Sequence, residues 1–163
     1  MEETPRFRVV AWWASERTGI AQSSSAPNAI HFTSPPAFGG VEGRWTPEDL
    51  LLCAVASCFT TTFREVAEHA KFEYTDLQVE VAGAIGKADT GYSFGEVLIQ
   101  ANLTIPQEAE HARATKLLQK AKSLCPVSRA LSLEQRFAAR VQVGDPRVEV
   151  SHPSPVSGKE SCR

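Results

Sequence analysis

The sequence predicts an α+β fold in which antiparallel sheets pack around a long central helix. Three observations support this class. Alternating or β-branched segments lie before and after one long apolar helix. The expected order of elements is strands, long helix, hairpin, helix, short helix and strand. The chain is also long enough to form a core. With 163 residues, 42% of them hydrophobic, we expect a single domain over residues 1–143. Residues 144–163 lack periodicity and are expected to form a flexible tail.

The N-terminal segment RFRVVAWWA, residues 6–14, is rich in β-branched and aromatic residues and predicts a strand. Return strands are expected at residues 20–22 and 29–33, separated by turn residues. Prolines and glycines then mark residues 34–45 as a loop.

The long helix is expected to begin after Thr46, which can cap it, and to reach about Ala70. Pro47 suits the first helical position, and Glu48 and Asp49 complement the positive end of the helix dipole. Its first half, LLLCAVASCF, is apolar all round, which indicates burial on every side. One small sheet and one further helix give too little cover, so we expect a second subunit in a homodimer.

Two alternating segments, residues 76–85 and 93–103, predict a hairpin whose turn lies in KADTG. A second helix is expected from a cap-like start at residues 104–107 to Ser123. Its expected core side chains are Leu117, Leu118, Ala121 and Leu124. A short helix in CPVSRALS and a strand over residues 137–143 complete the prediction.

The formal net charge of −2 gives no basic field for nucleic acid or for an anionic membrane. The opening MEETPRFRVV has no apolar signal region, and no eighteen apolar residues run together. We therefore expect a cytoplasmic protein with small-molecule or protein partners, and neither nucleic acid nor membrane among them.

Four cysteines stand at positions 53, 58, 125 and 162. They form no CxxC pair, and no second close Cys/His pair follows Cys53 and Cys58, so neither a metal site nor a cofactor is expected. Cys53 is expected to pack in the core and Cys162 to lie exposed on the tail.

Cys125 stands directly before Pro126, at an expected helix start, where free backbone N–H groups of Val127 and Ser128 favour a thiolate. Free cysteine is also a small hydrophobe that often fills core space. Cys58 lies in mid-helix, away from either dipole end. Taken singly, each cysteine leaves chemistry and packing open.

Together, TPEDLLLCAVASCF and the later CPVSRAL resemble the two-motif signature of the OsmC/Ohr family of peroxide-reducing proteins. The resemblance covers roughly residues 5–143 and implies an intertwined homodimer. It also implies a pair of redox cysteines, Cys58 and Cys125, that reduces organic hydroperoxides. SRAL resembles the OsmC branch and ERTG the Ohr branch, so the branch stays open.

The resemblance further implies an arginine and a glutamate in the site. SERTGIAQSS places the arginine role on Arg17, and the P-E motif places the glutamate role on Glu48. In GRWTPE, Arg44 competes for the arginine role and Trp45 could reshape the pocket mouth. A desolvated mid-helix thiol has a raised pKa, which a guanidinium would counter. Arg17 could instead be an ordinary solvated charge of the loop. Glu48 could instead only complement the helix dipole.

The implied cycle forms a Cys58 sulfenic acid and then a Cys58–Cys125 disulfide, which an external dithiol reduces. By family resemblance this dithiol could be a lipoyl protein. Apolar neighbours favour alkyl or lipid hydroperoxides over hydrogen peroxide, although most of them would serve the core first. These neighbours are Leu51, Phe59, Phe63 and either Phe38 or Trp45.

Two other classes of function remain: a redox sensor without turnover and a non-catalytic ligand-binding protein. The position of Glu48 is also open. Ten residues of continuous helix separate the backbones of Glu48 and Cys58 by roughly 15 Å. Either an arginine bridges the gap, or the helix begins later, or Glu48 serves the partner subunit's site.

Overall fold

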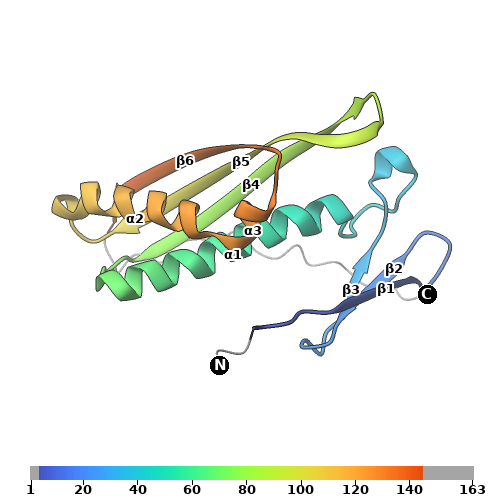
Figure 1. The fold of residues 1–163 in the computed structure, drawn as a ribbon, viewed down its shortest axis with the longest axis horizontal. Coiled ribbons are helices and arrows are strands. Elements are labelled where there is room, and N and C mark those ends of the chain that lie inside the picture. Colours follow the sequence, from blue (N-terminus) through green and yellow to red (C-terminus); the bar gives the residue numbers. More distant parts are fainter. Residues whose placement is uncertain (1–3, 145–163) are drawn as a thin grey trace. The chain divides into compact units, whose positions relative to one another are not determined.

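A computed structural model describes residues 4–144 of the chain, and its elements follow the expected α+β order (Figure 1). The N-terminal elements are β1 (Val9–Trp13), β2 (Gly19–Ser23), β3 (Ile30–Phe32), the 3-10 turn η1 (Pro36–Phe38) and α1 (Pro47–Ala70). Then come β4 (Asp76–Ala88), β5 (Gly91–Ile105), the 3-10 turn η2 (Glu108–Glu110), α2 (His111–Leu124), α3 (Pro126–Ala130) and β6 (Glu134–Val143).

The chain divides into two compact units, whose described parts are residues 4–51 and residues 52–144. The single domain over residues 1–143 stays a prediction. Of the expected C-terminal tail, residues 145–163 lie outside the described residues.

The N-terminal unit contains an antiparallel sheet in the order β1-β2-β3. Trp12 pairs with Ile20 across β1 and β2, and Ala21 pairs with Ile30 across β2 and β3. The backbone N–H of Ala14 donates to Thr18 O at 2.9 Å and closes the first turn. The three strands expected in this region are confirmed.

α1 begins and ends where its sequence predicts. The Thr46 hydroxyl accepts from the Asp49 backbone N–H at 3.1 Å, and the Asp49 carboxylate accepts from the Thr46 N–H at 2.9 Å. This reciprocal capping satisfies donors that the first helical turn leaves free. Lys71 has a φ of 50°, a left-handed conformation that ends the helix.

Only one face of α1 is buried within the single chain. Val55, Phe59 and Phe63 are fully buried, whereas Cys53 and Ser57 are exposed. The expectation of burial on every side is therefore wrong for one chain. By length and composition α1 could cross a membrane, but its buried face packs in the core beside β5, which is the behaviour of a core helix.

The C-terminal unit contains a sheet in the order β4-β5-β6. β4 and β5 form the expected antiparallel hairpin, with Val81 opposite Ile99. β6 pairs with β5 in parallel, with Phe137 opposite Ile99, so the expectation of purely antiparallel sheet is wrong here. The reason is the connection: η2, α2 and α3 form a crossover that returns the chain to the same end of the sheet.

The second helix begins later than its sequence predicts. β5 continues to Ile105, and α2 begins only at His111, after η2. Leu103, Thr104 and Ile105 are all buried, so both faces of the strand end are covered and the strand extends through the cap-like residues. Leu117, Leu118 and Ala121 are buried as expected, but Leu124 is 45% exposed.

Candidate functional site

The structure brings Cys58 of α1 close enough to Cys125 for the two thiols to act on each other. Both are free thiols. Cys58 is half-buried, whereas Cys125 is 0% exposed and belongs to the hydrophobic core. Two neighbouring thiols are candidates for a disulfide, and of these two only Cys58 is open to solvent in the chain.

Opposing effects act on the Cys125 thiol. Burial is the largest and raises its pKa, because desolvation disfavours the thiolate. The Ser128 backbone lowers the pKa, as the helix start predicts, and Lys122 lowers it through its positive charge. Cys58 raises it through the hydrogen bond and through charge repulsion. The net shift is upward, so the stabilising effect of the helix start is present but outweighed.

A polar cluster beside Cys125 was not identified from the sequence. The Lys122 ammonium donates to Ser128 Oγ at 2.7 Å and to Gln135 Oε1 at 2.9 Å. Ser128 is only 1% exposed, although it is polar. The one signal in the sequence is the serine of CPVS, but nothing there indicates that a lysine of α2 and a glutamine of β6 reach it.

Arg17 lies in the turn between β1 and β2, in the N-terminal unit. Its guanidinium donates to Gly39 O at 2.6 Å, and its own carbonyl accepts from the buried Thr33 hydroxyl at 2.7 Å. Gly39 ends η1 at a φ of 81°, a left-handed conformation that suits glycine. Arg44 is exposed. Arg17 is therefore held by its own unit, although its role toward the sulfurs stays a prediction.

Glu48 lies in the first turn of α1. Its Oε2 atom is shut off from solvent and, among the described residues, has no hydrogen-bond partner. A carboxylate oxygen in this state is costly and favours a donor such as a guanidinium. Because α1 is continuous from Pro47, a later helix start no longer explains how Glu48 could reach Cys58.

The apolar residues expected near Cys58 separate into two groups. Phe59 and Phe63 are 0% exposed and pack against Phe137 and Tyr74, with ring centroids 5.5 Å and 5.2 Å apart. They belong to the core, so their suggested second role as pocket wall is not met. Leu51 is half-buried, and Phe38 and Trp45 expose about half of their surface.

Cys53 is exposed in the chain, so the expectation that it packs in the core is wrong. It lies on the uncovered face of α1. Cys162 falls outside the described residues. Within residues 4–144, no three His, Cys, Asp or Glu side chains are grouped so that they could hold a metal ion.

The model of the family described as OsmC-like protein matches residues 40–138. The chain is 26% identical to the uncharacterized protein YmaD of Bacillus subtilis over 85% of its own length and 95% of that protein. It is 28% identical to peroxiredoxin OsmC of Escherichia coli over 71% of its length and 79% of that protein.

A solved structure of an organic hydroperoxide resistance protein from Elizabethkingia anophelis has a similar fold, with a TM-score of 0.72 at 23% identity. The match covers 87% of this chain and 100% of that one. At this identity the likeness shows the fold alone. The family model spans more than half of the chain and includes Cys58 and Cys125. The chain therefore belongs to the family of OsmC-like proteins.

Proposed function

We propose that this protein is a thiol-dependent peroxidase that reduces organic hydroperoxides to alcohols. The Cys58 thiolate attacks the distal peroxide oxygen, the O–O bond breaks, and the alkoxide leaves as the alcohol after taking a proton. Cys125 then attacks the Cys58 sulfenic acid, which gives a Cys58–Cys125 disulfide and water. An external dithiol reduces the disulfide and becomes a disulfide itself.

The observation that carries the proposal is the contact between two thiols that differ in exposure. Cys58 is half-buried and Cys125 is fully buried, and the Cys58 thiol acts on the Cys125 thiol. An attacking thiol must meet the peroxide, whereas a resolving thiol need only meet the first sulfur. This difference supports attack by Cys58 and resolution by Cys125. Peroxiredoxin OsmC of Escherichia coli, which the chain resembles, supports the reaction class.

Arg17 is the proposed partner of the Cys58 thiolate and of the peroxide. Its hydrogen bond to Gly39 limits its freedom, and guanidinium is always charged and weakly hydrated. Glu48 is the proposed orienting carboxylate, because its buried Oε2 atom needs a donor. A 10-fold or greater loss of peroxidase rate is expected for Arg17→Met, with a much smaller effect for Arg44→Met.

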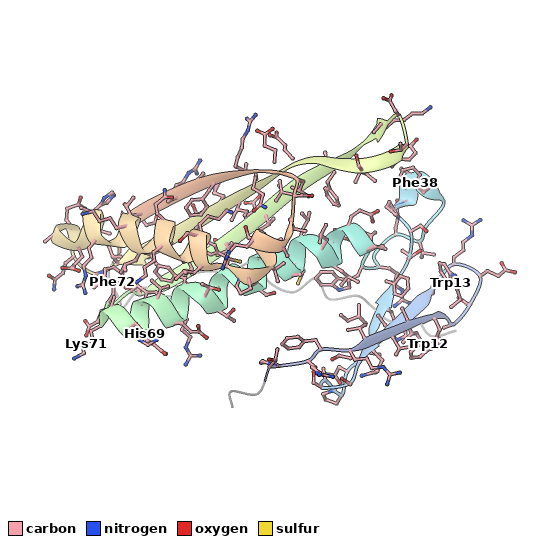
Figure 2. All side chains as sticks on the ribbon, viewed as in Figure 1. Trp12, Trp13, Phe38, His69, Lys71 and Phe72 are labelled. Carbon is pink, nitrogen blue, oxygen red and sulfur yellow. The ribbon has the colours of Figure 1, made fainter. Side chains whose placement is uncertain are left out.

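A homodimer is the proposed assembly. β1 carries Val9, Trp12 and Trp13, and side chains on both of its faces are exposed (Figure 2). Exposed apolar side chains on both faces of an edge strand favour cover by another chain. The uncovered face of α1 gives a second such surface. Light scattering coupled to size-exclusion chromatography is expected to give twice the chain mass, and a monomer at micromolar concentration would contradict this assembly.

Titration of free thiols before and after one equivalent of cumene hydroperoxide tests the function. We expect two thiols to be lost per chain and to return with dithiothreitol, over many cycles. A sensor would lose the same two thiols once, without turnover. A ligand-binding protein would lose none. A lipoyl dithiol as physiological reductant and a cytoplasmic location remain part of the proposal.

A further inference from the structure

A partly buried polar cluster links the last turn of α2, the middle of α3 and the start of β6. It consists of Lys122, Ser128 and Gln135. The Lys122 ammonium donates to both other side chains, and the Ser128 hydroxyl also bonds to Gln135 Oε1. Ser128 brings the cluster to the first turn of α3, which begins directly after Cys125.

The hydrogen bonds of this cluster have only one consistent orientation. Gln135 Nε2 donates to Ser128 O at 2.8 Å and to Leu131 O at 3.2 Å. The amide oxygen must therefore face Lys122, since a reversed amide would set N–H groups against the ammonium. The glutamine thus binds the middle of α3 and the residue that follows its last turn, and it turns its oxygen toward the lysine.

Lys122 occupies an unusual place for a lysine. A cation in the last turn of a helix complements the dipole equally well from solvent. Lys122 is instead half-buried and bonded to a serine that is 1% exposed. Burying an ammonium costs free energy, so a position facing inward requires a compensating partner. The developing charge on the Cys125 sulfur would provide one.

We propose that Lys122 is a positioning residue that acts through Ser128 to hold Cys125 ready to carry negative charge. The inference rests on the proposed function, because it concerns the second thiol of that cycle. Lys122 fixes the Ser128 side chain, and Ser128 in turn presents its backbone to the Cys125 sulfur.

Negative charge develops on this sulfur in two steps. In disulfide formation, Cys125 sulfur attacks Cys58 sulfur, the S–S bond forms, the S–O bond of the sulfenic acid breaks, and the leaving hydroxide takes the thiol proton as water. In reduction, an external thiolate attacks Cys58 sulfur, and Cys125 leaves as a thiolate. A nearby ammonium stabilises both transition states, and neither step needs an additional oxidant or reductant.

The direction of the pH dependence follows from the groups around the sulfur. Cys58 from α1 and Lys122 from α2 are the titratable groups that act on it, while Ser128 and Gln135 are neutral. Arg129 of α3 is exposed. Burial raises the Cys125 pKa and Lys122 opposes this rise. Loss of Lys122 should therefore move the rate profile of disulfide formation to higher pH.

The first test compares Lys122→Met with Lys116→Met, which removes an exposed lysine of the same helix. Each protein reacts with one equivalent of cumene hydroperoxide without reductant, and disulfide is quantified by mass spectrometry. We expect Lys122→Met to form disulfide several-fold more slowly at pH 7, because a smaller fraction of Cys125 is then thiolate. Sulfenic acid formation on Cys58 should be unchanged, and Lys122→Arg should restore most of the rate. A uniform slowing at every pH would indicate a merely structural role and overturn the proposal.

A second test does not depend on peroxidase activity. In a chain with Cys53, Cys58 and Cys162 replaced by serine, Cys125 is the single cysteine, and thiolate absorbance reports its titration. Lys122→Met should raise the midpoint, because Lys122 lowers the Cys125 pKa through its positive charge, and Lys116→Met should not. Equal midpoints would overturn the role of Lys122 even in an active peroxidase. Failure of the wild type to consume hydroperoxide would reject the proposed function while this titration still decides the role of Lys122.

Discussion

The Cys125 thiol lies within interaction range of the Cys58 thiol, although Cys125 is fully buried at the start of α3 and Cys58 is half-exposed on α1. The relationship orders the chemistry. In the proposed cycle a peroxide meets Cys58 first, and the resulting sulfenic acid forms beside its resolving thiol. This arrangement limits the lifetime of the sulfenic acid, which further peroxide would otherwise oxidise irreversibly.

Serine substitutions of the two thiols should have different effects. Cys58→Ser should abolish hydroperoxide consumption, because Cys125, the other thiol of the pair, is closed to solvent. Cys125→Ser should still permit one oxidation per chain but block turnover with a dithiol through the disulfide route. Consumption assays and sulfenic acid trapping by a dimedone reagent measure both effects.

Cys53→Ser is the matched control for these variants, because Cys53 lies on the same helix and is exposed. It should retain wild-type turnover. Sulfenic acid trapped on Cys125 in the Cys58→Ser protein would reverse the assigned roles.

Organic hydroperoxides should react at least tenfold faster than hydrogen peroxide. An apolar wall contributes roughly 0.8 kcal/mol per buried methylene, so two methylenes give about a tenfold rate difference. With Phe59 and Phe63 buried in the core, Trp45, Phe38 and Leu51 are the remaining candidates for this wall. Second-order rate constants for cumene hydroperoxide and hydrogen peroxide measure the preference.

Trp45→Ala should reduce the cumene hydroperoxide rate more than the hydrogen peroxide rate. Tyr92→Ala truncates an exposed aromatic side chain on the β4–β5 hairpin and should change neither. Equal rate constants for the two peroxides in the wild type would remove the argument for an apolar wall.

Glu48 should complete the active site of the partner subunit. It stands ten residues before Cys58 on a continuous helix, so the two backbones are roughly 15 Å apart. A glutamate side chain is too short for that distance, and a two-fold dimer of α1 helices could bring each Glu48 toward the opposite Cys58. A heterodimer of a Glu48→Ala chain with a Cys58→Ser chain should therefore keep one complete site.

Differently tagged chains, co-expressed and purified through both tags, provide this heterodimer. Its expected peroxidase rate is about half that of the wild type per dimer. If each site were self-contained, the heterodimer would be no more active than either mutant homodimer, and that result would reject sharing.

Alkaline pH should destabilise the reduced protein through Cys125. Burial raises the Cys125 pKa in the folded state, so the folded chain keeps its thiol proton to a higher pH than the unfolded chain, whose ordinary value is 9.0. The contribution of this thiol to the free energy of unfolding is complete below the unfolded-state pKa. It is lost as pH rises above that pKa, by at most about 1.4 kcal/mol per pH unit. Urea unfolding under reducing conditions at several pH values should show this slope.

Cys125→Ala removes the titrating group and leaves a small cavity in the core. We expect it to be less stable than the wild type at neutral pH but to have a flatter dependence above pH 9. Parallel slopes for the two proteins would assign the alkaline effect to other groups.

Local chemistry in the sequence was sufficient to predict α1 and the hairpin. Thr46 and Pro47 define the helix start through capping and a fixed φ, and both effects act within one turn. The alternation around Val97, Ile99 and Ala101 predicted a buried strand face, and all three side chains are buried. The family motifs contain both cysteines, so the sequence alone is enough to identify the pair.

Contacts between distant segments decided the rest. The end of β5 at Ile105 depends on burial of both strand faces, and the parallel pairing of β6 depends on the crossover through α2. The cluster of Lys122, Ser128 and Gln135 joins three elements, and its hydrogen bonds have no sequence period. The sequence determined which thiols this protein has and which helices carry them, because capping and periodicity are local. Only the tertiary structure decided that one thiol is buried beside a lysine while the other is half-exposed, because burial and charge depend on what the fold packs against each sulfur.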